Sequence, residues 1–198
     1  MVFSYGFLDN DTNNARQIFL DLDFPHEGLG LAKRAFCKEL PGVKLSVDPS
    51  NPECTDWDSS FVWWACVGEE DGLDFDILQM TDGERELRAT WKGEDLGNPE
   101  NFRDRLAADP LWDVFQLRAV VTILNRVETQ LSILQKTEAI ISDVGQDEDL
   151  LKAIFRPDVF NTVSRLRRLE TDLLSKEVDG LVKRVSDPSR DQYLSTAL

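Results

Sequence analysis

The sequence contains only one histidine and three cysteines in its 198 residues. Cys37, Cys54 and Cys66 form no Cys-x-x-Cys pair, and their odd number makes a poor disulfide framework. His26 is the single histidine available for a zinc site or a Ser-His-Asp triad. Because it lies in a Phe-Pro-His-Glu-Gly turn, we interpret it as a solvated loop residue. Zinc-dependent hydrolysis, serine-hydrolase triads and disulfide-stapled folds are therefore not expected, and no metal site is predicted.

Long apolar runs are also lacking. No stretch approaches the ~20 consecutive apolar residues that a membrane-spanning helix needs. The N-terminus has no basic region followed by an apolar stretch, so the sequence shows no secretory signal. We therefore expect a reduced, intracellular protein, cytoplasmic or nuclear, that does not bind membranes.

Positive charge is scarce: 22 Lys and Arg stand against 37 Asp and Glu, a net charge of −15. Such a surface repels nucleic-acid phosphates and anionic lipids, so no nucleic acid is expected as a partner. Residues 48–86 hold 12 of the acids and a single base, Arg85, for a net charge of −11. This acidic segment is either an ordinary solvated surface or the place where a basic protein partner binds.

The first half of the chain alternates short strand patterns with turn residues. Residues 16–24 alternate apolar and polar side chains and predict a half-buried strand, and residues 28–40 predict a short helix that ends at a Pro-Gly pair. Composition indicates a loop at 48–58. The strongest hairpin signal joins residues 73–80 to residues 84–91 through a Thr-Asp-Gly turn.

The second half is predicted to be helical. Asn98 and Asp109 are each followed by a proline, which is typical of a cap and first helical turn. The expected elements, in order, are a long helix from Asp109 to about Ile141, a break at 142–146, a short helix at 147–155 and a long helix at 158–185. Apolar residues recur at spacings of three and four from Leu117 to Leu134. This stripe favours an antiparallel intramolecular bundle, with a coiled coil as the alternative.

Two clusters in the acidic segment are candidate contact sites. The acids of residues 69–76 lack the spacing of an EF-hand loop, so a solvated loop or a contact with a basic partner is the better interpretation. Trp63 and Trp64 belong to an aromatic cluster with Phe61 and Trp57. Core packing is the ordinary role of such a cluster, and a peptide-contacting groove is the alternative.

The most informative motif lies in the first nine residues, Phe3-Ser4-Tyr5-Gly6-Phe7-Leu8-Asp9. It resembles the closing Tyr-Gly-Phe motif of SET-domain lysine methyltransferases, specifically the Rubisco large-subunit methyltransferase and its fungal protein-lysine relatives. The strand pattern at 17–23, the Phe75-Asp76-Ile77 strand and the closing helix with Arg167-Arg168-Leu169-Glu170 follow it. Their order is similar to the mainly helical substrate-binding domain that follows the SET core in this subgroup.

The resemblance implies a fold and a domain organisation. Residues 1–9 would be the remnant of a SET core, residues 10–186 a Rubisco-methyltransferase substrate-binding-like domain, and residues 187–198 a flexible tail. The expected fold class is mainly α, with a multi-helical domain, long C-terminal helices and a small strand and hairpin portion in the N-terminal half.

The resemblance also implies roles for two residues of the motif. The hydroxyl of Tyr5 would hold and polarise the target lysine amine at the methyl-transfer site, where a fixed donor and an aligned amine are required. Phe7 would form an aromatic wall beside it. The family's Gly-x-Gly and Asn-His-Ser segments, which bind S-adenosylmethionine, precede this motif and do not occur here. Gly28-Leu29-Gly30 comes after the motif. We therefore expect no cofactor in this chain and no methyl transfer by the chain alone.

The function that the resemblance implies is recognition of a protein substrate. The chain would present a lysine-bearing, basic protein to a catalytic core that it lacks. The candidate substrate-binding residues are Phe7, Trp63, Trp64, Glu69, Glu70 and Asp71. The alternative is a cytosolic helical scaffold that binds a partner helix or a second copy of itself, with no role in methylation.

Overall fold

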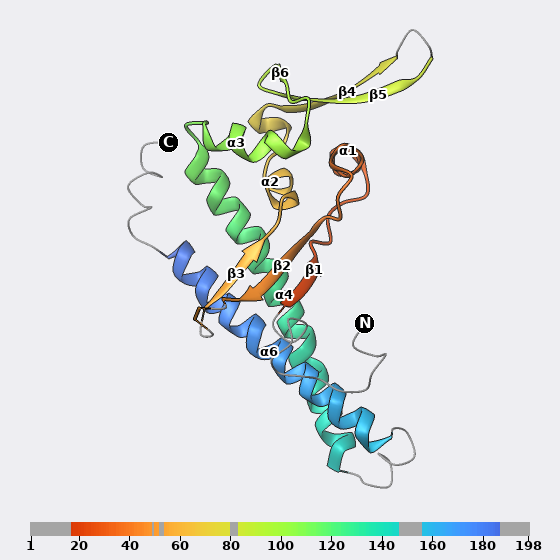
Figure 1. Cartoon of the computed structure of the whole chain (residues 1–198), viewed down its shortest axis with the longest axis vertical. Coiled ribbons are helices and arrows are strands. Elements are labelled where there is room, and N and C mark those ends of the chain that lie inside the picture. Colours follow the sequence, from red (N-terminus) through yellow and green to blue (C-terminus); the bar gives the residue numbers. More distant parts are fainter. Residues whose placement is uncertain (1–16, 49, 52–53, 80–82, 147–155, 187–198) are drawn as a thin grey trace. The chain divides into compact units, whose positions relative to one another are not determined.

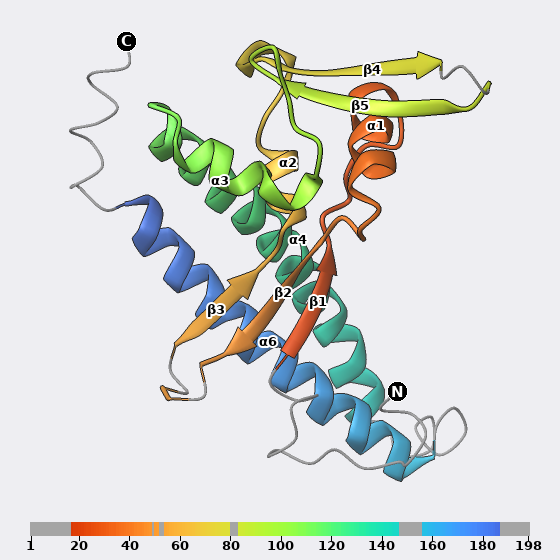
Figure 2. The same ribbon diagram turned by 45° about the horizontal axis from the view of Figure 1, so that its top comes forward.

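The computed structural model describes residues 17–48, 50–51, 54–79, 83–146 and 156–186 (Figures 1 and 2). Its principal elements are listed in chain order: β1 (Gln17–Asp21), α1 (Gly28–Cys37), β2 (Gly42–Val47), β3 (Thr55–Asp58), α2 (Phe61–Ala65), η3 (Glu69–Asp71), β4 (Leu73–Gln79), β5 (Arg85–Trp91), β6 (Glu94–Asp95), η4 (Pro99–Asn101), α3 (Phe102–Ala107), α4 (Trp112–Gln146) and α6 (Pro157–Val185). The chain forms two compact units: unit 1 comprises Met1–Phe19, Lys44–Trp57 and Leu124–Val182, and unit 2 the remainder.

The expectation of a mainly α, multi-helical domain is wrong, because the fold is mixed α/β. The structure is 56% helical and 21% strand, with two three-stranded antiparallel sheets and five α-helices in its described part. The strand orders are β1-β2-β3 and β4-β5-β6. Residues 48–58, interpreted as a loop from their polar composition, include all of β3. Pairing with a neighbouring strand, which composition does not record, determines this segment's conformation.

The predicted hairpin of β4 and β5 is confirmed. The two strands pair without interruption from Leu73 opposite Trp91 to Gln79 opposite Arg85. Side chains at the inner end are buried, with Leu73 1% and Trp91 6% exposed, whereas Ile77 towards the turn is 67% exposed. The hairpin is therefore buried at its inner end, whereas side chains of its outer half are exposed.

Aromatic side chains make up much of the core of unit 2. The short helix α2 places Trp63 and Trp64 in this core, where Trp64 stacks on Phe102 with ring centroids 4.0 Å apart. Trp63 stacks on Trp112 with a centroid separation of 5.1 Å. Aromatic side chains of this size bury ~150–250 Å² each, so these contacts are a major source of the unit's stability.

In unit 1 the long helices α4 and α6 lie side by side and run in opposite directions (Figures 1 and 2). Arg167 of α6 reaches α4, where its Nη2 donates hydrogen bonds to the carbonyl oxygen of Leu134, at 2.8 Å, and to Thr137 Oγ1. The predicted break at 142–146 is wrong, because α4 continues to Gln146. One glycine within a helix costs only ~1 kcal/mol, which tertiary context can offset. The short helix predicted at 147–155 lies outside the described residues.

A lysine is buried in unit 2. Lys33 of α1 is 3% exposed, and its Nζ donates a hydrogen bond to the carbonyl oxygen of Val67. Nζ also lies 5.5 Å from the centroid of the Phe24 ring. Burial lowers the pKa of the Lys33 ammonium from its ordinary 10.5, although nearby Cys66 and Glu70 favour the charged form.

The lowered pKa of Lys33 gives stability a definite pH dependence. Below pH 10.5 the unfolded chain binds more protons at this position than the folded chain does, so this residue makes stability rise with pH up to that value. We expect Lys33→Met to be as stable as the parent or more stable at neutral pH, because it removes a buried charge. Between about pH 8 and about pH 10, the free energy of unfolding should rise less with pH in the variant than in the parent protein. Urea unfolding of both proteins across this range measures the difference, and parallel stability curves would contradict the assignment.

Candidate functional site

The structure places the sequence-predicted aromatic residues away from solvent or outside its described part. Tyr5 and Phe7 lie outside the described residues. Trp63 is 7% exposed and Trp64 is 2% exposed, and both pack within the aromatic core of unit 2. Their side chains stabilise the unit and offer almost no surface to a partner.

The predicted acidic residues divide into two kinds. Asp71 is held within unit 2: its carboxylate accepts hydrogen bonds from the Gly68 backbone N–H at 2.9 Å and from Arg118 Nη1 at 2.7 Å, and its side chain is 7% exposed. Glu69 and Glu70 are exposed on η3. Asp71 therefore anchors the η3 turn to α4. Sequence reasoning did not find Arg118, because it lies 47 residues away and nothing in its local pattern marks it as a partner.

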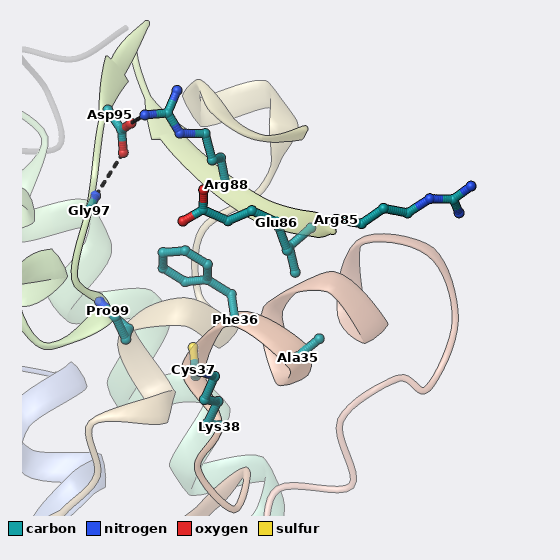
Figure 3. A pocket seen from close by; sticks show the side chains of 11 residues that line it. Ala35, Phe36, Cys37, Lys38, Arg85, Glu86, Arg88, Asp95, Gly97 and Pro99 are labelled. Carbon is teal, nitrogen blue, oxygen red and sulfur yellow. Dashed lines mark hydrogen bonds and ion pairs between the residues drawn. The ribbon is translucent and has the colours of Figure 1, made fainter. Parts of the chain in front are cut away.

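A groove of about 500 Å³ lies elsewhere in unit 2, between α1 and the hairpin. The C-terminal end of α1, from Ala35 to Lys38, forms one wall, and β5 from Arg85 to Arg88 forms the other (Figure 3). Asp95, Gly97 and Pro99 close one end. We call this the β5 groove. Its volume is in the range of pockets that hold small molecules or parts of peptides.

The polar groups of the β5 groove are unequally satisfied. Arg88 Nη2 and Asp95 Oδ2 form an ion pair at 2.8 Å, and Asp95 Oδ1 accepts a hydrogen bond from the Gly97 N–H at 2.8 Å. Glu86 is exposed, and within the described part of the chain no hydrogen bond or ion pair engages it. In Figure 3 its carboxylate faces the groove from the β5 wall, whereas the Arg85 side chain points away from the groove.

The opposite wall is largely apolar. Phe36, on α1, is half-buried, and its ring contacts Trp64 and Phe75 with centroid distances of 5.5 and 5.9 Å. Beside it, burial raises the pKa of the Cys37 thiol to about 12, so the thiol stays protonated near neutral pH. A protonated, buried thiol is a poor nucleophile and a poor metal ligand. The α1 wall is thus suited to packing against apolar side chains and not to chemistry at the thiol.

The backbone of β5 is itself part of the site. Along its length β5 pairs with β4, but on its other edge β6 covers only Thr90 and Trp91. The edge from Arg85 to Arg88 has no strand partner in the described structure. A strand edge of this kind can pair with another extended segment.

Within the described residues, no group of three His, Cys, Asp or Glu side chains is arranged to hold a metal ion. The described helices include none that combines the length and the apolarity required to cross a membrane. Comparison of the chain with protein-family models, curated proteins and solved structures finds no match.

The β5 groove was not predicted from the sequence. Glu86 was noted only as one acid of the segment 48–86, and Phe36 only as part of a short helix. Alternation and turn chemistry predicted the hairpin, but its position against α1 depends on contacts between residues about 50 positions apart, which no local pattern records.

Proposed function

We propose that this chain is a protein-recognition module that binds a basic, lysine-bearing segment of a partner protein in the β5 groove. We further propose that it serves a SET-domain protein-lysine methyltransferase, whose catalytic core would act on the bound partner. The single observation that carries the proposal is the unpaired Glu86 carboxylate facing a groove whose other wall is apolar.

The chemistry of the groove suits a lysine-bearing segment. An unpaired carboxylate attracts an ammonium group, and the apolar α1 wall can pack against apolar residues next to the lysine in the same segment. The lining bases compete little for Glu86, because Arg88 is neutralised by Asp95 and the Arg85 side chain points away. Lys38 lies on the α1 wall.

The surrounding charge supports the same partner. Residues 48–86 have a net charge of −11, and Asp74, Asp76 and Glu84 are exposed near Glu86 on the hairpin. An acidic field of this kind raises the association rate of a basic partner and disfavours acidic ones. The link to methylation rests on the Tyr5 motif, which stays a prediction, and the cofactor would be bound by the catalytic core.

The burial of the α4 stripe argues against the scaffold alternative. Self-association through the stripe from Leu117 to Leu134 needs apolar side chains that are available to a partner helix. Val120, Val127 and Leu134 are 4%, 0% and 7% exposed within the chain itself, and Leu117, Leu124 and Leu131 are half-buried. Recognition of a partner through unit 2 does not require these buried side chains to become exposed.

The proposal predicts a specific loss of binding. Glu86→Gln should weaken the binding of a fluorescent lysine-containing peptide about fivefold, because an exposed ion pair contributes ~1 kcal/mol. Glu128→Gln removes the same charge from an exposed position on α4, outside the groove, and should leave the affinity nearly unchanged. Fluorescence anisotropy at low salt measures both affinities. Equal affinities for the two variants would contradict a role for Glu86.

A further inference from the structure

We infer that the partner segment binds as an additional antiparallel β-strand along the open edge of β5, with a lysine directly opposite Glu86. This inference rests on the proposed function and specifies how the groove recognises its partner. It assigns most of the affinity to backbone hydrogen bonds and the selectivity to side chains on alternating positions.

The direction of the β5 backbone groups follows from one hydrogen bond. The N–H of Leu96 donates to the carbonyl oxygen of Ala89 at 3.0 Å, so the polar groups of Ala89 point to the edge that β6 occupies. In a strand, the N–H and C=O groups of residues two apart point to the same side. The groups of Leu87 and Arg85 therefore point to the same edge, beyond the end of β6.

The regular register of the hairpin supports this assignment. From Leu73 opposite Trp91 to Gln79 opposite Arg85, each residue of β4 has one partner on β5, so no bulge reverses the alternation. Within the described residues, no hydrogen bond is recorded for the N–H or C=O groups of Arg85 and Leu87. Two donors and two acceptors are thus available along the groove.

An added strand would place its side chains in a defined pattern. Directly opposite residues of an antiparallel pair lie on the same face, with Cβ atoms about 4.5–5.5 Å apart. A lysine opposite Glu86 thus lies within reach of its carboxylate. The residue opposite Leu87 lies on the other face of the sheet, the face on which Phe75 contacts Phe36 of α1. The structure therefore selects a partner segment in which lysine alternates with apolar residues.

The charges around the groove favour a basic segment as its occupant. Across the hairpin, Asp76 and Glu84 add to the negative charge of Glu86, whereas Arg88 is paired with Asp95. A second copy of the chain adding through the same edge would bring Glu86 close to the partner's own acidic hairpin, which is unfavourable. A basic segment with its lysine opposite Glu86 is attracted by these acids, and of the other bases that line the groove, Arg85 points away from it and Lys38 lies beside the end of α1.

Backbone methylation of a synthetic peptide tests strand addition directly. The probe is a short peptide of alternating valine and lysine, titrated against the full chain by anisotropy. With lysine opposite Glu86, the valines face Arg85 and Leu87, and their N–H groups donate to β5. N-methylation of the valines should weaken binding by about tenfold or more, whereas N-methylation of the lysines should change it less than about threefold.

A pair of variants tests the same contact from the protein side. Arg85→Pro removes an N–H that points to the open edge and leaves the β4 pairing intact, a position where edge strands tolerate proline. Arg85→Ala removes the same side chain but keeps the N–H. We expect Arg85→Pro to bind the peptide at least about threefold more weakly than Arg85→Ala.

The outcomes separate this inference from the proposed function. If the parent peptide binds and depends on Glu86, but valine and lysine N-methylation have equal effects, strand addition is wrong and the proposed function stands. If the parent peptide does not bind at all, the proposed function fails and the inference fails with it. Sedimentation that shows a dimer, with the Arg85 and Leu87 amides protected from hydrogen exchange without peptide, would assign the edge to a second copy and overturn the inference.

Discussion

Replacing Trp64 with alanine should destabilise unit 2 by ~3–5 kcal/mol, the usual cost of removing a buried tryptophan. Trp64 is 2% exposed and stacks on Phe102, and its ring lies 5.5 Å from that of Phe36. Because a typical domain is stable by only ~5–15 kcal/mol, this one change removes a large part of the total. We also expect loss of peptide binding, since Phe36 forms part of the groove wall.

Chemical denaturation followed by circular dichroism measures this loss. Leu40→Ala is the matched control, because Leu40 is 76% exposed and its removal should cost less than ~0.5 kcal/mol. A Trp64→Ala protein that unfolds at the same denaturant concentration as the parent would show that Trp64 does not pack in the core of unit 2.

Removing Arg118 should have the second-largest effect. Arg118→Ala leaves the Asp71 carboxylate, whose side chain is 7% exposed, with the Gly68 N–H and without its cation. Removing one partner of a buried ion pair lowers the free energy of unfolding by ~3–5 kcal/mol. Because the Arg118 side chain is 41% exposed, we expect a smaller loss of about 2–3 kcal/mol. The result should be a less stable η3 turn.

A double-mutant cycle isolates this interaction. Asp71→Ala combined with Arg118→Ala should be less destabilising than the sum of the two single changes, with a coupling energy of ~1–3 kcal/mol. The free energies of unfolding of the four proteins, measured in urea, give this coupling energy. Strictly additive effects would mean that the pair does not link η3 to α4.

Local sequence patterns predicted those elements whose neighbours are close in the chain. The β4–β5 hairpin followed from alternation and a Thr-Asp-Gly turn, and α6 from its apolar period, because each depends on residues a few positions apart. β3 was missed because Thr55–Asp58 is polar and becomes a strand only through pairing. The mainly α expectation itself came from the resemblance to a helical substrate-binding domain, and the two sheets contradict it.

The candidate site shows the same limit. Sequence alone left Trp63 and Trp64 open between core and surface, and their burial assigns them to the core. It gave Asp71 the same role as Glu69, although a distant arginine holds only Asp71. The importance of Glu86 depends on its facing a groove formed with α1, which long-range packing creates and which local composition does not encode.

The central claim is that the β5 groove binds an extended, lysine-bearing segment. Amide chemical shifts of the isotope-labelled chain, followed during titration with the alternating valine–lysine peptide, test it most directly. We predict saturable shifts concentrated at Ala35–Lys38 beside α1 and at Arg85–Arg88 on β5, and the same shifts in the Glu86→Gln protein only at about fivefold higher peptide concentration. Shifts confined to α6, or no shifts in the parent protein, would contradict the claim.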